Sequence, residues 1–348
     1  MTRSITQASA IQEALDQEMA RDSRVLVMGL GVDDPKAILG TTRGLAEKYG
    51  PLRVFDTPLS EDAMTGAAIG MALAGLRPVH VHIRVDFLML AMNQIVNVAA
   101  KTHYMYGGRE RVPLVIRAII GKSWGQGAQH SQALHSFFMH VPGLRVAAPV
   151  TAYDAKGCLI AAIRDDNPVI FIEHRQLHGL QSDVPEQPYE CPPGRARVMA
   201  EGTDVTLVGI SYMAVECLRA REYLKEKGIS AEVIDPVWLS PLDLEAIAAS
   251  ASRTRRMLVV DTAWLPCGAG AEIIAGLVES LGCGDGLQLR RMGFAHSSCP
   301  PTPGLEAGFY PNATSIASRA YAMVSGDPRP WTPVERADLR AVEFRGPF

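Results

Sequence analysis

Short apolar segments alternate with stretches of helical periodicity in two successive runs along this chain of 348 residues. The first run begins with an amphipathic helix that carries Ala8, Ile11, Leu15 and Met19 on one face. The strands predicted after it lie at 25–28, 79–83, 113–116, 144–147 and 169–172, and the helices between them at about 88–104, 131–140 and 153–164. Continuous apolar strands separated by helices indicate a parallel sheet that helices cover on both faces.

A segment rich in proline and glycine interrupts this pattern after residue 177 and predicts an interdomain linker over 178–200. The second run then has predicted strands at 204–210, 231–234, 257–261 and 287–291, and predicted helices at 212–227, from Ser240-Pro241 onward and at 269–281. The sequence therefore predicts an α/β fold with two doubly wound domains, at 1–177 and 201–325. Residues 326–348 are rich in proline and charge, and we expect them to form a surface tail.

The charge balance argues against two kinds of partner. The chain has 34 basic and 37 acidic side chains, a net charge of −3, so it lacks the basic surface that nucleic acid or an anionic membrane attracts. No apolar run approaches the roughly 18 residues that span a bilayer. The charged, amphipathic N-terminal segment lacks the apolar centre of a signal peptide, and a cytoplasmic location is expected.

Motifs for metal, disulfide and phosphate chemistry are missing. The six cysteines form no CxxC pair, so we expect reduced, mostly buried thiols and no zinc site. Neither a complete GxGxxG after the first strand nor a GxxxxGK[ST] loop is present, which argues against a dinucleotide or nucleotide phosphate site. Gly284-Asp285-Gly286 is interpreted as a turn, because no pair of asparagines follows it at the spacing of a diphosphate-magnesium motif.

Residues 56–78 are the most informative segment of the sequence. Pro58 and Ser60 predict the start of a helix that ends near Gly75, and small residues fill its interior. Glycine within a helix costs about 1 kcal/mol relative to alanine, so close packing with another helix, at a subunit interface, is expected to compensate. Glu61 falls in the first turn of this helix, which we expect to be buried. Glu61 is either a functional acid or a residue that stabilises the helix N-terminus.

A second polar segment, 121–132, follows a predicted strand and precedes a predicted helix. The carboxyl end of a strand is where ligands bind in an open α/β sheet, and His130 is expected to open the next helix and face a pocket or solvent. A histidine at the start of a helix can equally be a cap or a surface residue. His103, His135 and His140 are expected to be helix-surface or packing residues.

Several motifs in the same order resemble one family. The run DTPLSEDAMTGAAIGMALAGLRP is similar to a signature of the beta subunits of thiamine-diphosphate-dependent 2-oxo acid dehydrogenases, which belong to the transketolase-like family. Further similar segments are QIVNVAAKTHYMYGG, VPLVIR, GQGAQHSQ, HVPGLRVAAPVTAYDAKGCLIAAIRDDNPVIFIE and PVWLSPLD. The resemblance covers residues 4–325 and implies a transketolase-like pyrimidine-binding domain followed by a transketolase C-terminal domain. In this family the alpha subunit carries the diphosphate-magnesium motif.

The resemblance also implies roles for particular residues. Glu61 would hydrogen-bond a pyrimidine nitrogen of thiamine diphosphate and so promote loss of the thiazolium proton, for which a carboxyl group with a raised pKa is suited. His130 would stabilise or protonate the acyl intermediate, or guide a lipoyl thiol. Phe87 and Leu30 would lie near the cofactor. The implied partners are an alpha subunit, in an α2β2 heterotetramer, and a lipoyl acyltransferase or acyl carrier protein. The family also has a potassium site, whose mostly carbonyl ligands match Leu114, Ala162, Ile163, Asp165 and Asn167.

Some residues depart from the family pattern. Leu30 stands where an acid near the cofactor is usual. His82, Arg84 and Lys122 are possible cations around the site, and they would suit a phosphorylated or otherwise anionic donor. The alternative is that they form salt bridges with the alpha subunit.

We predict the beta subunit of a 2-oxo acid dehydrogenase that is catalytic only with its alpha subunit. One alternative keeps the cofactor and changes the reaction: a split transketolase that moves a two-carbon ketol unit from a sugar phosphate to an acceptor or carrier protein. An alternative of another class is a non-catalytic assembly or regulatory subunit. Only the loss of the acid at Leu30 supports that last alternative, and the presence of Glu61 argues against it.

Overall fold

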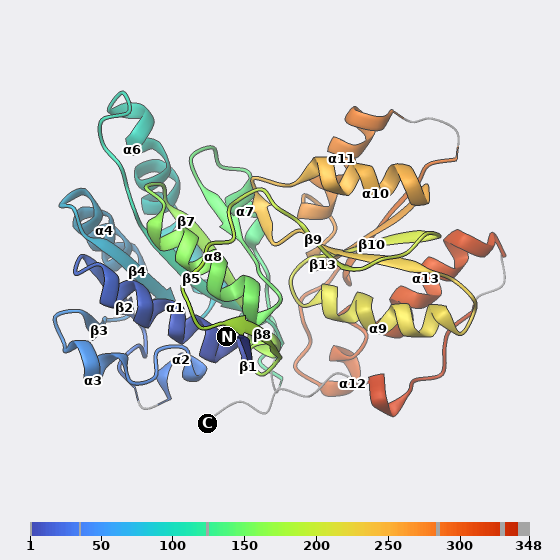
Figure 1. Ribbon diagram of the computed structural model, residues 1–348, viewed down its shortest axis with the longest axis horizontal. Helices are drawn as coiled ribbons and strands as arrows, with labels where there is room; N and C mark the ends of the chain where they lie inside the picture. The colour runs from blue at the N-terminus through green and yellow to red at the C-terminus, as the bar shows by residue number, and fades with distance from the viewer. Residues whose placement is uncertain (1, 35, 123–124, 283–285, 328–330, 340–348) are drawn as a thin grey trace. The chain divides into compact units, whose positions relative to one another are not determined.

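The computed structural model describes residues 2–34, 36–122, 125–282, 286–327 and 331–339. These residues form two compact units (Figure 1). Unit 1 contains residues 2–122 and 137–193, and unit 2 contains residues 125–136 and everything described from 194 onward. Among these residues the chain therefore passes from one unit to the other three times: before residue 125, after residue 136 and after residue 193.

Unit 1 is built on a parallel sheet with the strand order β6-β7-β5-β4-β2-β3. Its strands are β2 (Val25–Gly29), β3 (Val54–Asp56), β4 (Arg77–His82), β5 (Val115–Ile120), β6 (Arg145–Ala147) and β7 (Val169–His174). The prediction of a parallel sheet is confirmed, and its five predicted strands are present with ends shifted by a few residues. β3 was not predicted: its three residues end in the charged Asp56 and include only two apolar residues, Val54 and Phe55.

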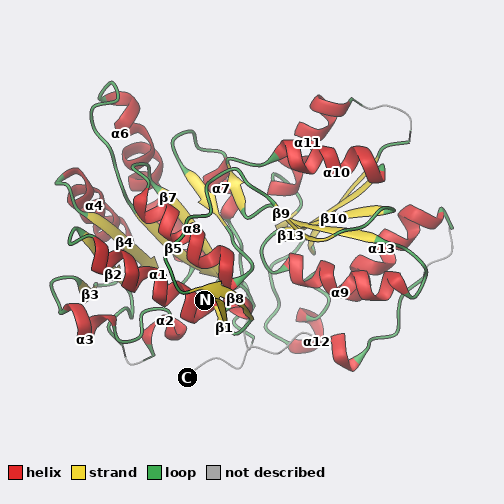
Figure 2. Cartoon of the chain, viewed as in Figure 1, coloured by secondary structure: helices red, strands yellow, loops and turns green. Residues whose placement is uncertain are grey.

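The helices of unit 1 include two that pack side by side, α1 (Gln7–Arg21) and α8 (Ala152–Arg164) (Figure 2). The helix predicted within residues 56–78 is α4 (Glu61–Leu73), which packs on β4. The predicted helix 88–104 is a succession of helical turns: α5 (Val85–Leu88), a 3-10 turn (Met89–Ala91), a π turn (Gln94–Ala99) and α6 (Ala100–Met105). The remaining helices are α2 (Ala37–Gly40), α3 (Leu45–Tyr49) and a 3-10 turn at Arg175–Leu177.

A small antiparallel sheet joins the N-terminus of unit 1 to the segment predicted as a linker. β1 (Thr2–Thr6) pairs with β8 (Gln181–Pro185). Residues 181–185 contain a single large apolar residue, Val184, so the sequence shows no strand pattern there. The strand forms because its backbone groups pair with β1, which lies nearly 180 residues earlier in the chain. A local sequence pattern cannot reveal such a distant partner.

Unit 2 has a second sheet with the order β14-β13-β10-β11-β9, parallel except for its edge strand β9. Its strands are β9 (Arg197–Ala200), β10 (Val205–Gly209), β11 (Ala231–Asp235), β13 (Arg256–Trp264) and β14 (Gln288–Phe294); its helices are α9 (Met213–Lys225), α10 (Leu244–Thr254), α11 (Ala269–Leu281), α12 (Pro303–Glu306) and α13 (Ala313–Ser325). Unit 2 also contributes β12 (Trp238–Ser240), and a final 3-10 turn spans Ala337–Leu339. The doubly wound α/β fold is thus confirmed in both units.

The start of α10 differs from the prediction. Ser240-Pro241 is a cis peptide bond after β12 rather than the opening of the helix. α10 begins at Leu244, where the side chain of Asp243 accepts a hydrogen bond from the Ala246 N–H and so caps the helix. The prediction was wrong because Ser-Pro and Leu-Asp are both plausible helix starts, and only the tertiary path of the chain selects between them.

A buried ion pair ties β5 to β7 inside unit 1. Arg117 donates to both carboxylate oxygens of Glu173, with distances of 2.6 Å from Nε and 2.8 Å from Nη2. Nε2 of His178 lies 3.2 Å from the same carboxylate. Burial raises the pKa of Glu173, but the charge of Arg117 and the contact with His178 outweigh burial and lower this pKa to about 2. The carboxylate therefore stays ionised in the folded chain.

We expect Glu173→Gln to destabilise the chain by about 3–5 kcal/mol at pH 7, because it leaves the Arg117 guanidinium buried without a counter-charge. Since folding lowers the pKa of Glu173, its stabilisation is present above the ordinary value of 4.5 and disappears as the pH falls towards 2. Urea unfolding of wild type and variant at several pH values measures both effects, with the exposed Glu47→Gln as control. Equal stabilities of Glu173→Gln and wild type at pH 7 would contradict this account.

Candidate functional site

The candidate site lies at the carboxyl edge of the sheet in unit 1. β5, β4, β2 and β3 are neighbours in this sheet and run parallel, so the segments that follow them meet at one edge. Leu30 follows β2, Arg84 follows β4 and Lys122 follows β5. The segment after β3 leads within five residues to Glu61. The structure thus brings Leu30, Glu61, Arg84 and Lys122 to a common edge.

The turn that carries Leu30 is tied to its neighbours on both sides. The Leu30 N–H donates to the Val81 carbonyl oxygen over 3.2 Å, and the Gly31 N–H donates to the Asp56 carboxylate at the end of β3. Gly29, with φ of 140°, has no room for a side chain, because a Cβ there would lie 2.2 Å from the Val81 oxygen. Three strands therefore fix where Leu30 sits.

Glu61 is the first residue of α4, and its side chain is half-buried. The Ser60 side chain makes no capping hydrogen bond, so the capping-box alternative does not apply here. The Glu61 carboxylate has no hydrogen-bond or ion-pair partner among the residues that the structure describes. A carboxylate at a helix N-terminus is favoured by the helix dipole, and this one remains available to a ligand.

α4 is less buried than expected. Only Thr65, Ala68, Ile69 and Ala72 are buried in the single chain. A Cβ added at Gly66 would touch the Gln94 side chain, whereas one added at Gly70 would meet no atom of this chain within 4 Å. The close backbone approach expected at these glycines is therefore not made within the described chain, and packing against another subunit stays a prediction.

Two histidines on one face of β4 form a buried pair. Nε2 of His82 lies 3.3 Å from Nδ1 of His80, which is 3.5 Å from the Thr65 hydroxyl on α4. Burial lowers the pKa of His80 to about 4, and burial together with the charge of His80 holds the pKa of His82 well below its ordinary value. Both imidazoles are therefore neutral at pH 7, and His82 adds no positive charge to the site. His80 was not predicted, although its spacing of two from His82 in a strand indicates a shared face.

Arg84 and Lys122 are the cations at this edge. The Arg84 side chain is buried and donates from Nη1 to the Gly121 carbonyl oxygen over 3.4 Å, which links the end of β4 to the end of β5. Lys122 follows directly and is half-buried. The pKa of the buried His174 is lowered mainly by burial, next by His178, and to a smaller extent by the positive charge of Lys122. Phe87, one turn beyond Arg84 on α5, exposes 38 % of its surface.

His130 is placed differently from the residues above, because it belongs to unit 2. It does not open a helix: α7 (His135–Met139) begins five residues later, and the His130 N–H donates to the Gly127 carbonyl over 3.4 Å in a turn. The expected helix start was wrong because the buried Ala133 and Leu134 and the polar residues before them are held in an irregular loop. Trp124, noted in the same loop, lies outside the described residues.

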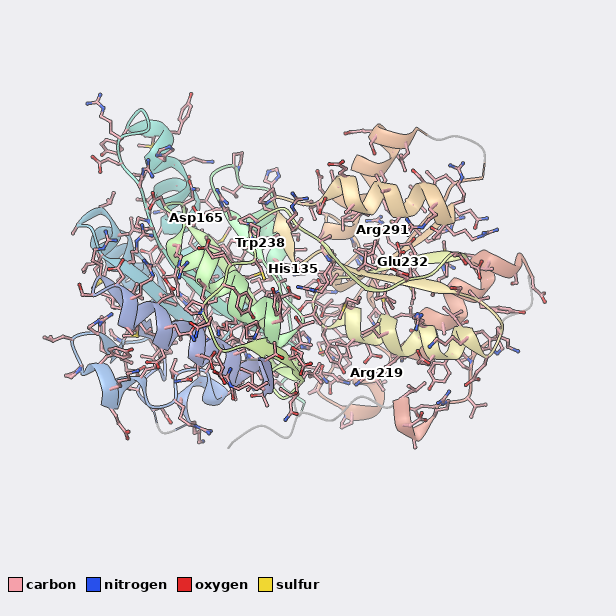
Figure 3. All side chains as sticks on the ribbon, in the orientation of Figure 1. His135, Asp165, Arg219, Glu232, Trp238 and Arg291 are labelled. Atoms are coloured by element: carbon pink, nitrogen blue, oxygen red, sulfur yellow. The ribbon has the colours of Figure 1, made fainter. Side chains whose placement is uncertain are left out.

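The five residues matched to a potassium site gather at the C-terminal end of α8. Leu114 accepts from the Val169 N–H over 2.9 Å, and Asn167 donates to the Asp165 carboxylate over 2.8 Å (Asp165 is labelled in Figure 3). Carbonyl oxygens at a helix C-terminus suit a monovalent cation. Arg77 already donates from Nη1 to the carbonyls of Ile163 and Asp165, at 2.9 and 3.0 Å, so a bound potassium ion would share these oxygens with a guanidinium.

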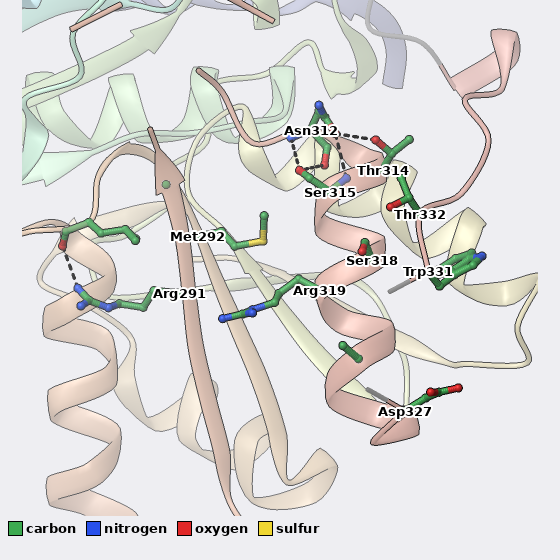
Figure 4. A pocket seen from close by; sticks show the side chains of 13 residues that line it. Arg291, Met292, Asn312, Thr314, Ser315, Ser318, Arg319, Asp327, Trp331 and Thr332 are labelled. Atoms are coloured by element: carbon green, nitrogen blue, oxygen red, sulfur yellow. Dashed lines mark hydrogen bonds between the residues drawn. The ribbon is translucent and has the colours of Figure 1, made fainter. Parts of the chain in front are cut away.

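Other features of the described residues give less support for a functional site. Among the described residues no group of three or more His, Cys, Asp and Glu side chains could hold a metal ion, and no helix is long and apolar enough to cross a membrane. The five described cysteines are free thiols, three of them buried. A cavity of about 680 Å³ in unit 2 lies between β14, α13 and the segment after it; Figure 4 shows Met292, Ser318 and Arg319 among its lining residues. None of the predicted site residues lines this cavity.

Comparison with known proteins identifies the family. Residues 3–181 match the pyrimidine-binding domain of transketolase, and residues 194–316 match the transketolase C-terminal domain. The chain is 41 % identical over 336 residues to the beta subunit of acetoin:2,6-dichlorophenolindophenol oxidoreductase from Cupriavidus necator, covering 94 % of this chain and 99 % of that one. It is 44 % identical over 269 residues to the beta subunit of the pyruvate dehydrogenase E1 component from Rickettsia felis. That match covers 77 % of this chain and 82 % of the Rickettsia protein.

A solved structure shares the fold. A split gene transketolase, described as an inactive beta4 tetramer, superposes with a TM-score of 0.74 over 92 % of this chain and 98 % of that chain, at 21 % sequence identity. The sequence matches therefore confirm the resemblance stated above, and the structural match confirms the fold. This chain belongs to the transketolase-like family, among the beta subunits of the pyruvate and acetoin dehydrogenase type.

Proposed function

We propose that this chain is the beta subunit of a thiamine-diphosphate-dependent 2-oxo acid dehydrogenase and works with an alpha subunit. The observation that carries the proposal is the Glu61 carboxylate, which stands at the N-terminus of α4 without a partner in the described chain. A half-buried acid left free of hydrogen bonds is typical of a group that a ligand satisfies. The family of the chain indicates which ligand this is.

The residues at the carboxyl edge fit the aminopyrimidine of thiamine diphosphate by their chemistry. Glu61 would exchange a hydrogen bond with a ring nitrogen, and Phe87 and Leu30 would contact the ring with apolar surface. When bound, the cofactor supplies the carbon nucleophile and the electron sink that decarboxylation needs. Glu61 would hold, at one carboxylate oxygen, the proton that it shares with the ring nitrogen.

His130 would handle protons on the substrate side. Histidine is the side chain that most readily donates or accepts a proton near neutral pH, and His130 is only half-buried. We therefore assign it the protonation or stabilisation of the acyl group before its transfer to a carrier, which would be a lipoyl acyltransferase or an acyl carrier protein.

The remaining assignments are also proposals. The alpha subunit would supply the diphosphate-magnesium site, since the sequence contains no such motif, and two alpha and two beta chains would assemble. Potassium at the end of α8, the domain boundaries at 177, 200 and 325, and a cytoplasmic location stay predictions. The non-catalytic alternative has no support beyond Leu30.

A second candidate, ketol transfer from a sugar phosphate, rests on Arg84 and Lys122. Both cations lie at the carboxyl edge that carries Glu61, where they could bind a phosphate group. The neutral state of His82 reduces the positive charge available for this role.

We expect the purified chain alone to bind thiamine diphosphate weakly or not at all, because it has no diphosphate-magnesium motif. Titration calorimetry with thiamine diphosphate and magnesium should show no saturable heat, and addition of the alpha subunit should restore binding. Tight binding to the chain without its partner would rule out the two-subunit proposal.

Glu61→Gln should assemble normally, since the two side chains are nearly isosteric, and should slow cofactor activation by about 10²–10⁴. The measurement is deuterium exchange at the thiazolium carbon of the cofactor in the assembled enzyme. Asp62→Asn is the matched control, an exposed acid in the same helical turn. Exchange at the wild-type rate in Glu61→Gln would show that Glu61 does not have this role.

Donor choice separates the two candidate reactions. If Arg84 and Lys122 bind a phosphate, Arg84→Gln and Lys122→Ala should each lower kcat/KM for a ketose phosphate about tenfold or more and leave pyruvate and branched 2-oxo acids unaffected. The exposed Lys36→Ala serves as control. The main proposal expects the wild-type enzyme to release carbon dioxide from a 2-oxo acid; turnover of ketose phosphates alone would favour ketol transfer.

A further inference from the structure

The loop at residues 125–136, here called the His130 loop, is part of unit 2 although it lies between β5 and β7 of unit 1 in the sequence. We propose that buried contacts within unit 2, centred on Asp261 and Tyr310, position His130 for its reaction. The inference rests on the proposed function for the role of His130, and it adds residues from the C-terminal domain to the site. These are positioning residues, because nothing places them against substrate or cofactor.

The C-terminal end of the loop is held by a buried histidine and a buried aspartate. Nε2 of His135 lies 3.1 Å from Oδ1 of Asp261 on β13, and their side chains are 1 % and 3 % exposed (His135 is labelled in Figure 3). The two polar groups lie next to each other without the alignment of a regular hydrogen bond. Removal of either one would leave the other polar group buried without its partner, which is costly in a low-dielectric interior.

The N-terminal end of the loop lies against residues 299–301. Gly125 has a φ of 74°, and a Cβ there would lie 2.6 Å from the Pro301 carbonyl oxygen. At Gly127, with a φ of 70°, a Cβ would lie 3.6 Å from the Pro301 side chain. Gly125 therefore allows the loop to pass this segment at a distance that no residue with a Cβ permits, whereas at Gly127 only the positive φ favours glycine.

Tyr310 supports the segment that the loop packs against. Its hydroxyl lies 3.3 Å from the Cys299 sulfur, in the same 299–301 segment that Gly125 and Gly127 approach. Burial is the main cause that raises the pKa of Tyr310. The phenol therefore remains protonated at neutral pH and can donate a hydrogen bond.

His130 lies between these two anchors. Ser131, the next residue, is 2 % exposed, and Ala133 and Leu134 are also buried. The backbone beside His130 is thus held on both sides while its own side chain remains half-buried. Because misplacement of a catalytic group by about 1 Å can cost two orders of magnitude in rate, such anchoring matters for a residue that sits on a loop.

The test uses the enzyme assembled with its alpha subunit. The variants are Asp261→Asn, which is nearly isosteric, His135→Gln, Tyr310→Phe and the double variant His130→Gln/Asp261→Asn. Glu279→Gln is the control, because it removes one negative charge from an exposed position on α11 of the same unit. The readouts are amide hydrogen exchange of peptides from 125–136, kcat and KM for the 2-oxo acid, and affinity for thiamine diphosphate.

We expect Asp261→Asn to speed amide exchange in the His130 loop about tenfold and to lower kcat about tenfold, with KM and cofactor affinity unchanged. In the His130→Gln background the same change should have no further effect on kcat, because Asp261 acts through His130. Unchanged exchange in all three anchor variants, or an additive loss of kcat in the double variant, would overturn the proposal. If Asp261→Asn fails to assemble, Tyr310→Phe and His135→Gln decide by the same criteria.

Amide exchange also separates this inference from the proposed function. If the wild-type enzyme releases no carbon dioxide from any 2-oxo acid, the proposed function is refuted, and the positioning role is refuted with it. Exchange needs no substrate, so it would still show whether Asp261 and Tyr310 anchor the loop.

Discussion

Parallel pairing of β5, β4, β2 and β3 is the constraint on which the candidate site depends. Parallel strands end at the same edge of a sheet, so one pairing pattern collects side chains that lie up to about ninety residues apart in the sequence, such as Leu30 and Lys122. The buried Arg117–Glu173 pair ties β5 to the next strand, β7, and extends the same sheet. The position of the site is thus a property of the sheet, and the loops supply its chemistry.

The single chain presents a half-finished site. The Glu61 carboxylate has no partner among the described residues, Phe87 is partly exposed, and Gly70 on α4 faces space that no atom of this chain fills. A glycine within a helix costs about 1 kcal/mol relative to alanine, which close packing by another subunit would offset. A cofactor would supply a partner for the acid and cover the aromatic ring. The positive charge at the edge is smaller than its composition suggests, because His80 and His82 are neutral, whereas Arg84 and Lys122 are cations.

The residues of the proposed function are found in both units. Glu61, Phe87 and Leu30 belong to unit 1, whereas His130 is held by the contacts of unit 2. A family domain defined by sequence, residues 3–181, therefore contains a loop that the structure assigns to the other compact unit. Substitutions in the C-terminal domain can for this reason alter a reaction whose proposed acid–base residue lies in the N-terminal half of the sequence.

Local patterns in the sequence were sufficient to predict most strands of the two large sheets, the main helices and the position of Glu61, because apolar periodicity and helix-start residues act over a few neighbours. They could not predict β8 or the start of α10, which depend on backbone partners and on the path of the chain. His135 was expected to be a packing or helix-surface residue, and only the fold shows that its imidazole meets Asp261 on a strand more than 120 residues away. Likewise, the sequence alone suggested that His82 is a cation, whereas in the fold it is neutral. Burial disfavours the charged imidazole, and the sequence does not show that His82 is buried.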